Sequence, residues 1–128
     1  MIDHIGFAVS DLARSKAFYQ KALAPLGYSI FRELTPEQTG GGAHIGFWAN
    51  HEPDFWIGTG QALQGRLHVA FAANDRATVD EFYRAALAAG GRDNGAPGLR
   101  PEYHPGYYGA FVLDPDGNNV EAVYHDRH

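Results

Sequence analysis

Cysteine is absent from this chain of 128 residues, and basic side chains are few, with 10 Lys and Arg against 15 Asp and Glu and a formal charge of -5. The lack of thiols excludes disulfide bonds, thiolate metal ligands and a cysteine nucleophile. The acidic balance offers no basic patch for a phosphate backbone, so we expect no nucleic-acid partner. These absences exclude thiol chemistry and argue against a role in binding nucleic acid.

Long apolar runs are also missing. None approaches the roughly 20 residues that a membrane-spanning helix needs, and the start Met1-Ile2-Asp3-His4 lacks the basic and apolar stretches of a signal peptide. We therefore expect a soluble, cytoplasmic protein without a membrane partner. Hydrophobic residues make up 45% of the chain and charged residues 20%, which is ordinary for a globular protein of one domain, residues 1–128.

The chain repeats itself. Segment 4–27 aligns with segment 68–91 without a gap, and many aligned residues are identical, among them His4/His68, Phe7/Phe71, Asp11/Asp75, Phe18/Phe82, Tyr19/Tyr83 and Gly27/Gly91. Such self-similarity indicates a duplication. We interpret residues 1–60 and 66–128 as two modules joined by the linker 61–65.

Each module begins with a short β-rich run and an amphipathic helix. Ser10 or Asp11 in the first copy, and Asn74 or Asp75 in the second, are the expected helix caps. Strands are predicted afterwards at 28–34, 43–49 and 54–58, and again at 107–113 and 118–124. The strand expected just after the second helix is obscured by the Gly/Pro-rich segment 93–106. The pattern predicts an α+β protein of two tandem βαβββ modules.

Alternation along the strands separates two faces. His4 shares a face with Gly6 and Ala8, and His68 shares one with Ala70 and Ala72, whereas the opposite faces carry bulky residues. A lone His in a strand is most often structural. Two histidines at equivalent positions, each on a face of small residues, favour a ligand cleft instead.

Glu121 supplies a third group. A carboxylate in the middle of the apolar strand 118–124 is costly to bury unless a partner offsets its charge. We therefore predict one divalent metal held by His4, His68 and Glu121, with positions left open for water or substrate. These ligands suit Zn, Mn, Fe, Ni or Co. Such a site can polarise a carbonyl, stabilise an enolate or bind dioxygen.

Other polar and aromatic residues are weaker candidates. Tyr103, His104 and Tyr107 are candidates for proton transfer, although this loop can equally be a surface loop with aromatic anchors. The segment 114–117 is read as a hairpin turn, because it lacks the spacing of a calcium loop. His44, His51 and His128 are expected at the surface. The predicted substrate pocket includes Trp48, Trp56, Arg100, Tyr108 and His125.

The duplicated module, its paired histidines and the closing motif Leu113-Asp-Pro-Asp-Gly-Asn-Asn-Val-Glu121 resemble the vicinal oxygen chelate superfamily. This superfamily includes glyoxalase I, extradiol dioxygenases, fosfomycin-resistance transferases and bleomycin-resistance proteins. The resemblance implies an incomplete, curved β-barrel around a central cleft, with His4, His68 and Glu121 at the usual ligand positions. It also implies a fourth ligand in glyoxalase I, at a position where this chain has Trp56. That departure argues against strict lactoylglutathione lyase activity.

Two classes of function follow from the resemblance. One is a metal enzyme of lyase, dioxygenase or transferase type, in which a divalent ion chelates oxygens of a small substrate. The alternative is a metal-free, drug-sequestering protein of the bleomycin-resistance type, with Trp48 and Trp56 as stacking surfaces. The family commonly forms two-fold homodimers, and we expect one here. Whether the metal site lies within one chain or between two stays open.

Overall fold

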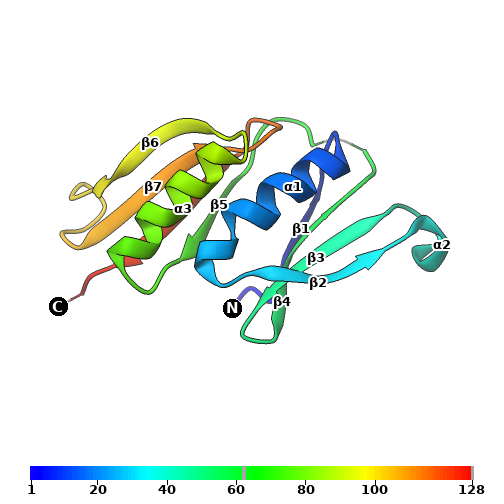
Figure 1. Cartoon of the computed structure of the whole chain (residues 1–128), viewed down its shortest axis with the longest axis horizontal. Helices are drawn as coiled ribbons and strands as arrows, with labels where there is room; N and C mark the ends of the chain where they lie inside the picture. The colour runs from blue at the N-terminus through cyan, green and yellow to red at the C-terminus, as the bar shows by residue number, and fades with distance from the viewer. Residues whose placement is uncertain (62, 128) are drawn as a thin grey trace.

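The computed structural model describes residues 1–61 and 63–127. Two βαβββ modules follow each other along the chain, and their sheets lie side by side (Figure 1). The expected surface position of His128 and part of the expected linker 61–65 fall outside the described residues. The predicted fold class is confirmed.

The elements follow the predicted order closely. The first module contains β1 (Ile5–Ala8), α1 (Leu12–Ala22), a 3-10 turn (Ala24–Leu26), β2 (Ser29–Leu34), α2 (Pro36–Thr39), β3 (His44–Ala49) and β4 (Glu52–Gly58). The second contains β5 (His68–Ala72), α3 (Arg76–Ala88), β6 (Arg92–Leu99), β7 (Tyr107–Leu113) and β8 (Asn119–His125). In the part of the chain that is described, no helix is long and apolar enough to cross a membrane.

Each module makes its own four-stranded mixed sheet. The strand orders are β1-β4-β3-β2 and β5-β8-β7-β6, and in each sheet the first strand of the module runs parallel to the last. The remaining neighbours are antiparallel. The duplication therefore produces two equivalent sheets, with β1 and β5 as equivalent edge strands.

The helices begin where the capping residues predict. Asp11 accepts a hydrogen bond from the backbone N–H of Arg14, and Asp75 accepts one from that of Thr78, which satisfies otherwise free donors of the first turns. Of the two candidate caps in each copy, the aspartate is thus the one used. Gly27, at φ 88°, ends the 3-10 turn in the left-handed conformation that glycine adopts without strain.

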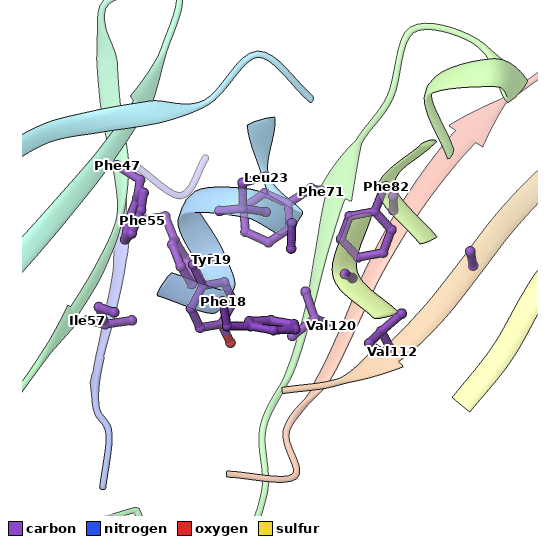
Figure 2. Close-up of a cluster of buried hydrophobic side chains, with 14 of the residues drawn as sticks. Phe18, Tyr19, Leu23, Phe47, Phe55, Ile57, Phe71, Phe82, Val112 and Val120 are labelled. Atoms are coloured by element: carbon purple, nitrogen blue, oxygen red, sulfur yellow. The ribbon is translucent and has the colours of Figure 1, made fainter. Parts of the chain in front are cut away.

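Aromatic side chains fill the space between the helices and the sheets. Figure 2 shows Phe18 and Tyr19 of α1 in one cluster with Phe55 of the first sheet and Phe71 of the second. The Phe55 and Phe71 ring centroids are 5.2 Å apart, so the two sheets share one core. Buried aromatic contacts of this kind are the main stabilising term of such a fold.

Two segments differ from the sequence expectation. The segment 36–42, between the predicted strands 28–34 and 43–49, contains the short helix α2, which Thr35 and Gln38 cap with reciprocal hydrogen bonds. The obscured segment 93–106 begins with a strand, β6, despite its Gly and Pro residues. Because β6 is an edge strand, Pro97 can lack an N–H there without breaking an inner ladder of the sheet.

Candidate functional site

His68 and Glu121 lie together on the face of the second sheet that the helices leave uncovered. The parallel register pairs Ala70 with Glu121, and the imidazole Nε2 of His68 is 2.8 Å from Oε1 of Glu121. Glu121 is only 1% exposed, as predicted for a costly buried carboxylate, whereas the His68 side chain is 53% exposed. The pair therefore consists of a buried carboxylate and an imidazole that is accessible to solvent.

Tyr107 completes this group from β7. Its phenol donates a hydrogen bond to Oε2 of Glu121, so each carboxylate oxygen has its own partner. Gly109 leaves room beside them, because a Cβ there would lie 3.1 Å from Oε2. Burial, followed by the hydrogen bond to Glu121, raises the pKa of Tyr107 well above its usual range. The phenol is thus a proton donor at neutral pH.

The His68–Glu121 pair fits two ligands of a divalent ion. Bonds of about 2.0–2.2 Å from a divalent ion to nitrogen and oxygen place neighbouring donors about 3.0 Å apart in octahedral coordination and about 3.4 Å apart in tetrahedral coordination, so the observed 2.8 Å needs only a small separation of the two side chains. Among the described residues, no Lys or Arg lies within ion-pair distance of Glu121. In the described part of the chain the buried carboxylate therefore has no permanently charged partner, which suits binding of a metal ion.

His4 lies elsewhere. It precedes β1, its side chain is 58% exposed, and its Nδ1 is 2.7 Å from Oδ1 of Asp3. Within residues 1–61 and 63–127, no three or more His, Asp or Glu side chains are grouped closely enough to hold a metal ion. One chain thus brings together His68 and Glu121 but not His4, and the three-residue site stays a prediction.

Trp56 occupies the place in the first sheet that Glu121 has in the second. It pairs with Gly6 of β1, as Glu121 pairs with the equivalent Ala70 of β5. Its ring lies over Gly46, where a Cβ would approach to 2.7 Å. Trp48 and Phe31 pack alongside, with Phe31 ring centroids at 4.7 Å from Trp48 and 6.1 Å from Trp56. The uncovered face of the first sheet is therefore an aromatic surface.

Tyr108 and Arg100, both predicted for the pocket, separate in the structure. Tyr108 donates a hydrogen bond of 2.7 Å to Asp80 on α3, because alternation along β7 turns it toward the helices while Tyr107 faces outward. The Arg100 guanidinium instead lies over the ring of Phe111 on the uncovered face. Sequence reasoning missed Phe111 and Phe31, although strand alternation places Phe111 on the face of Tyr107.

The loop between β6 and β7 is anchored by a histidine pair. Nε2 of His104 is 2.9 Å from Nδ1 of His125, and the two rings stack with centroids 5.1 Å apart. The Gly106 N–H donates to Nδ1 of His104, which assigns the proton of neutral His104 to Nε2. Tyr103, which is 61% exposed, packs on Tyr107 at 4.9 Å. The candidate proton-transfer residues thus form one cluster beside Glu121.

We expect His125 in the metal-free protein to titrate below the usual 6.5 of a histidine. Burial lowers its pKa first, and the Arg127 guanidinium and His104 lower it further, while Glu121 opposes them. Because the folded pKa is depressed, the stability contributed by neutral His125 is lost as pH falls from about 6.5 through the folded value. NMR titration measures the pKa of His125 directly. Arg127→Gln should raise the midpoint, and a wild-type midpoint at or above 6.5 would contradict the assignment.

The site lies on an open sheet face. One hollow of about 230 Å³ lies near Ser10 and Asp116, and another of about 290 Å³ lies beside the β3–β4 turn. Neither hollow is lined by His68 or Glu121. A ligand bound by His68 and Glu121 would therefore need a further surface to cover it.

Comparisons with known proteins agree with this fold. The profile of the Glyoxalase/Bleomycin resistance protein/Dioxygenase superfamily matches residues 1–122. A glyoxalase/bleomycin resistance protein from Albidiferax ferrireducens T118 is 28% identical, with coverage of 96% of this chain and 98% of that chain and a TM-score of 0.79. No curated protein matches.

Two further solved structures share the fold at lower identity. The fosfomycin resistance protein FosX from Listeria monocytogenes, complexed with Mn(II) and sulfate, is 20% identical, with coverage of 99% and 93% and a TM-score of 0.70. Lactoylglutathione lyase from Agrobacterium tumefaciens is also 20% identical, with coverage of 97% and 92% and a TM-score of 0.68. The duplicated modules and the family profile together show that this chain belongs to the glyoxalase/bleomycin resistance protein/dioxygenase superfamily.

Proposed function

We propose that the protein is a metal-dependent enzyme in which a divalent ion binds oxygens of a small substrate at His68 and Glu121. The observation that carries this proposal is the buried Glu121 carboxylate, whose oxygens are partnered by His68 and Tyr107 but, among the described residues, by no Lys or Arg. Burying an anion without a counter-charge is unfavourable, and a divalent ion removes that penalty. The reaction class is of lyase, dioxygenase or transferase type.

We further propose that the third ligand, His4, comes from a second copy of the chain in a two-fold homodimer. Three features support this: His4 is exposed, the His68–Glu121 face is uncovered, and β1 and β5 are both edge strands. Edge strands and half-covered sheets are surfaces that proteins usually cover, and two-fold pairing is the commonest way of doing so. The homodimer and the cytoplasmic location remain predictions.

The residues around the ion have distinct expected roles. A bound Zn, Mn, Fe, Ni or Co ion would supply Lewis-acid chemistry at the substrate oxygens. Tyr107 orients Glu121 through its hydrogen bond and leaves Oε1 directed to the His68 side. Tyr103 and His104 lie one contact farther out and are the candidates to move a proton.

One solved structure supports the metal, and the relatives do not point to one particular reaction. The FosX structure was solved with Mn(II), which the oxygen and nitrogen donors here also suit. Trp56, by contrast, stands at the position equivalent to Glu121 in the first sheet and offers no ligand atom. We therefore expect negligible turnover of the glutathione–methylglyoxal hemithioacetal.

Calorimetric titration of Mn²⁺ or Zn²⁺ into tag-free, chelator-treated protein tests the metal proposal. We expect about one ion per chain, with affinity reduced at least about hundredfold in His68→Ala because one ligand is lost. His51→Ala is the matched control, since His51 is exposed at the β3–β4 turn and packs on Trp48. Unchanged affinity in His68→Ala, or no binding by the wild type, would reject the site.

A metal-free binding protein is the second candidate, favoured by the aromatic surface of Phe31, Trp48 and Trp56. Such a surface can stack on a flat or cationic compound. The two candidates differ in metal dependence: sequestration requires tight ligand binding in the presence of a chelator. Tryptophan fluorescence of the chelator-treated protein reports this binding.

A further inference from the structure

Arg100 follows β6 and is held beside the His68–Glu121 pair. Its backbone N–H donates to the carbonyl of Tyr107 at 2.8 Å, which continues the pairing of β6 with β7. Its Cζ lies 5.4 Å from the centroid of Phe111, and the Phe111 ring centroid is 6.2 Å from that of His68. Phe111 also pairs with Glu121 in the antiparallel register. One aromatic ring therefore separates the guanidinium from the proposed metal ligands.

Glycines of β6 make room for this guanidinium. A Cβ at Gly95 would lie 2.9 Å from the Phe111 ring and 3.3 Å from Nη2 of Arg100, and a Cβ at Gly98 would lie 3.1 Å from Nη1. Nη2 donates to the carbonyl of Ala96 at 2.7 Å. The Gly-rich irregular strand thus forms a cradle that orients Arg100 on the uncovered face.

The Arg100 guanidinium has no acidic partner in the part of the chain that the structure describes. Among the described residues, no carboxylate lies within ion-pair distance of Arg100, whereas Lys16 pairs with Glu33 and Arg76 with Asp126. Within residues 1–61 and 63–127, only two backbone carbonyls accept hydrogen bonds from its side chain, that of Ala96 at 2.7 Å and that of Leu99 at 3.5 Å. Arginine carries five N–H donors and binds oxyanions in a forked geometry, so donors remain for a ligand.

We propose that Arg100 binds an oxyanion group of the substrate, at the end opposite to the oxygens that the ion chelates. This inference rests on the proposed function, because it assumes an ion at His68 and Glu121. It names the substrate class as a small chelating molecule with a carboxylate or a similar anionic group. In a chain of net charge -5, a positioned cation also draws such an anion to this face.

Hydroxamates with a second anionic end test this assignment. They chelate divalent ions through two oxygens, and the monohydroxamates of malonic, succinic and glutaric acid place a carboxylate at three different reaches. Alkyl hydroxamates of equal length are the neutral references. Calorimetry with the metal-loaded protein measures each affinity, at low salt and again at high salt.

We expect at least one carboxylate-bearing probe to bind about tenfold more tightly than its neutral reference, with the advantage reduced at high salt. Arg100→Gln should bring the ratio to about one while the neutral hydroxamates keep their affinity, which also shows that the variant is folded. Arg100→Lys should retain part of the advantage because it keeps the charge but loses the fork. Arg92→Gln, an exposed position on the same strand, should behave as wild type.

Two outcomes would overturn the assignment: no carboxylate advantage at any of the three lengths, or an advantage that survives in Arg100→Gln. Both would leave the proposed metal site intact, because the neutral hydroxamates would still bind. Failure of every hydroxamate to bind the metal-loaded protein, or failure to load metal, would instead refute the proposed function together with this inference.

Discussion

Replacing Asp114 by alanine is expected to lower the free energy of unfolding by about 3–5 kcal/mol. Asp114 is 1% exposed and accepts four hydrogen bonds: from the backbone N–H groups of Asp116 and Asn118, from the Asn118 side chain and from the Tyr19 hydroxyl, the last at 2.5 Å. Alanine would leave the donors of the buried residues Tyr19 and Asn118 without an acceptor, which costs more than the bonds themselves contribute.

The turn 114–117, which contains Asp114, also joins the two modules just before β8, the strand that carries Glu121. Tyr19 belongs to α1 of the first module, and the neighbouring Asp116 accepts hydrogen bonds from the backbone and hydroxyl of Ser10. Asp114→Ala should therefore also weaken metal binding by disturbing β8. Asp93→Ala is the matched control, because the exposed Asp93 likewise accepts from a tyrosine hydroxyl and a backbone N–H.

Urea unfolding followed by circular dichroism measures both variants. The control should lose less than about 1 kcal/mol, since its groups can bond to water instead. Equal losses in Asp93→Ala and Asp114→Ala would show that burial of the Asp114 network is not what stabilises the turn.

The repeat explains why so much of the fold could be predicted. Aligned copies reveal equivalent strands even where one copy is ambiguous, and alternation places His68 on a small-residue face that proves exposed at Ala70 and Ala72. The same logic predicted that Glu121 is buried, which the structure shows. The local periodicity of apolar residues was sufficient to predict these strand faces because each module consists mainly of regular strands and one amphipathic helix.

Other features depend on tertiary context that no local pattern carries. The strand β6 was obscured because Gly and Pro have low strand propensity, yet an edge position tolerates Pro97 and the glycines admit Phe111 and Arg100. Tyr108 was grouped with the pocket although alternation turns it to α3. The position of His4 relative to Glu121 depends on how the modules or two chains pack against each other. The spacing of residues along the sequence does not encode this packing.

Whether the metal site is shared between two copies can be measured by mixing two inactive variants. His4→Ala and Glu121→Ala should each retain little metal after dialysis when they are alone, because each lacks one ligand of every site and binds the ion at least about hundredfold more weakly. In a heterodimer with shared sites, His4 of the Glu121→Ala chain meets His68 and Glu121 of the His4→Ala chain, so one of the two sites is intact. Sedimentation equilibrium first establishes that the wild type is a dimer and that the variants exchange subunits.

After complete exchange of equal amounts, half of the dimers are mixed and each holds one intact site. Elemental analysis of the dialysed mixture is therefore expected to recover about a quarter of the wild-type metal content per chain. This recovery is the result that our account predicts. No recovery after confirmed exchange, or full occupancy in either variant alone, would contradict a metal site built from His68 and Glu121 of one chain and His4 of another.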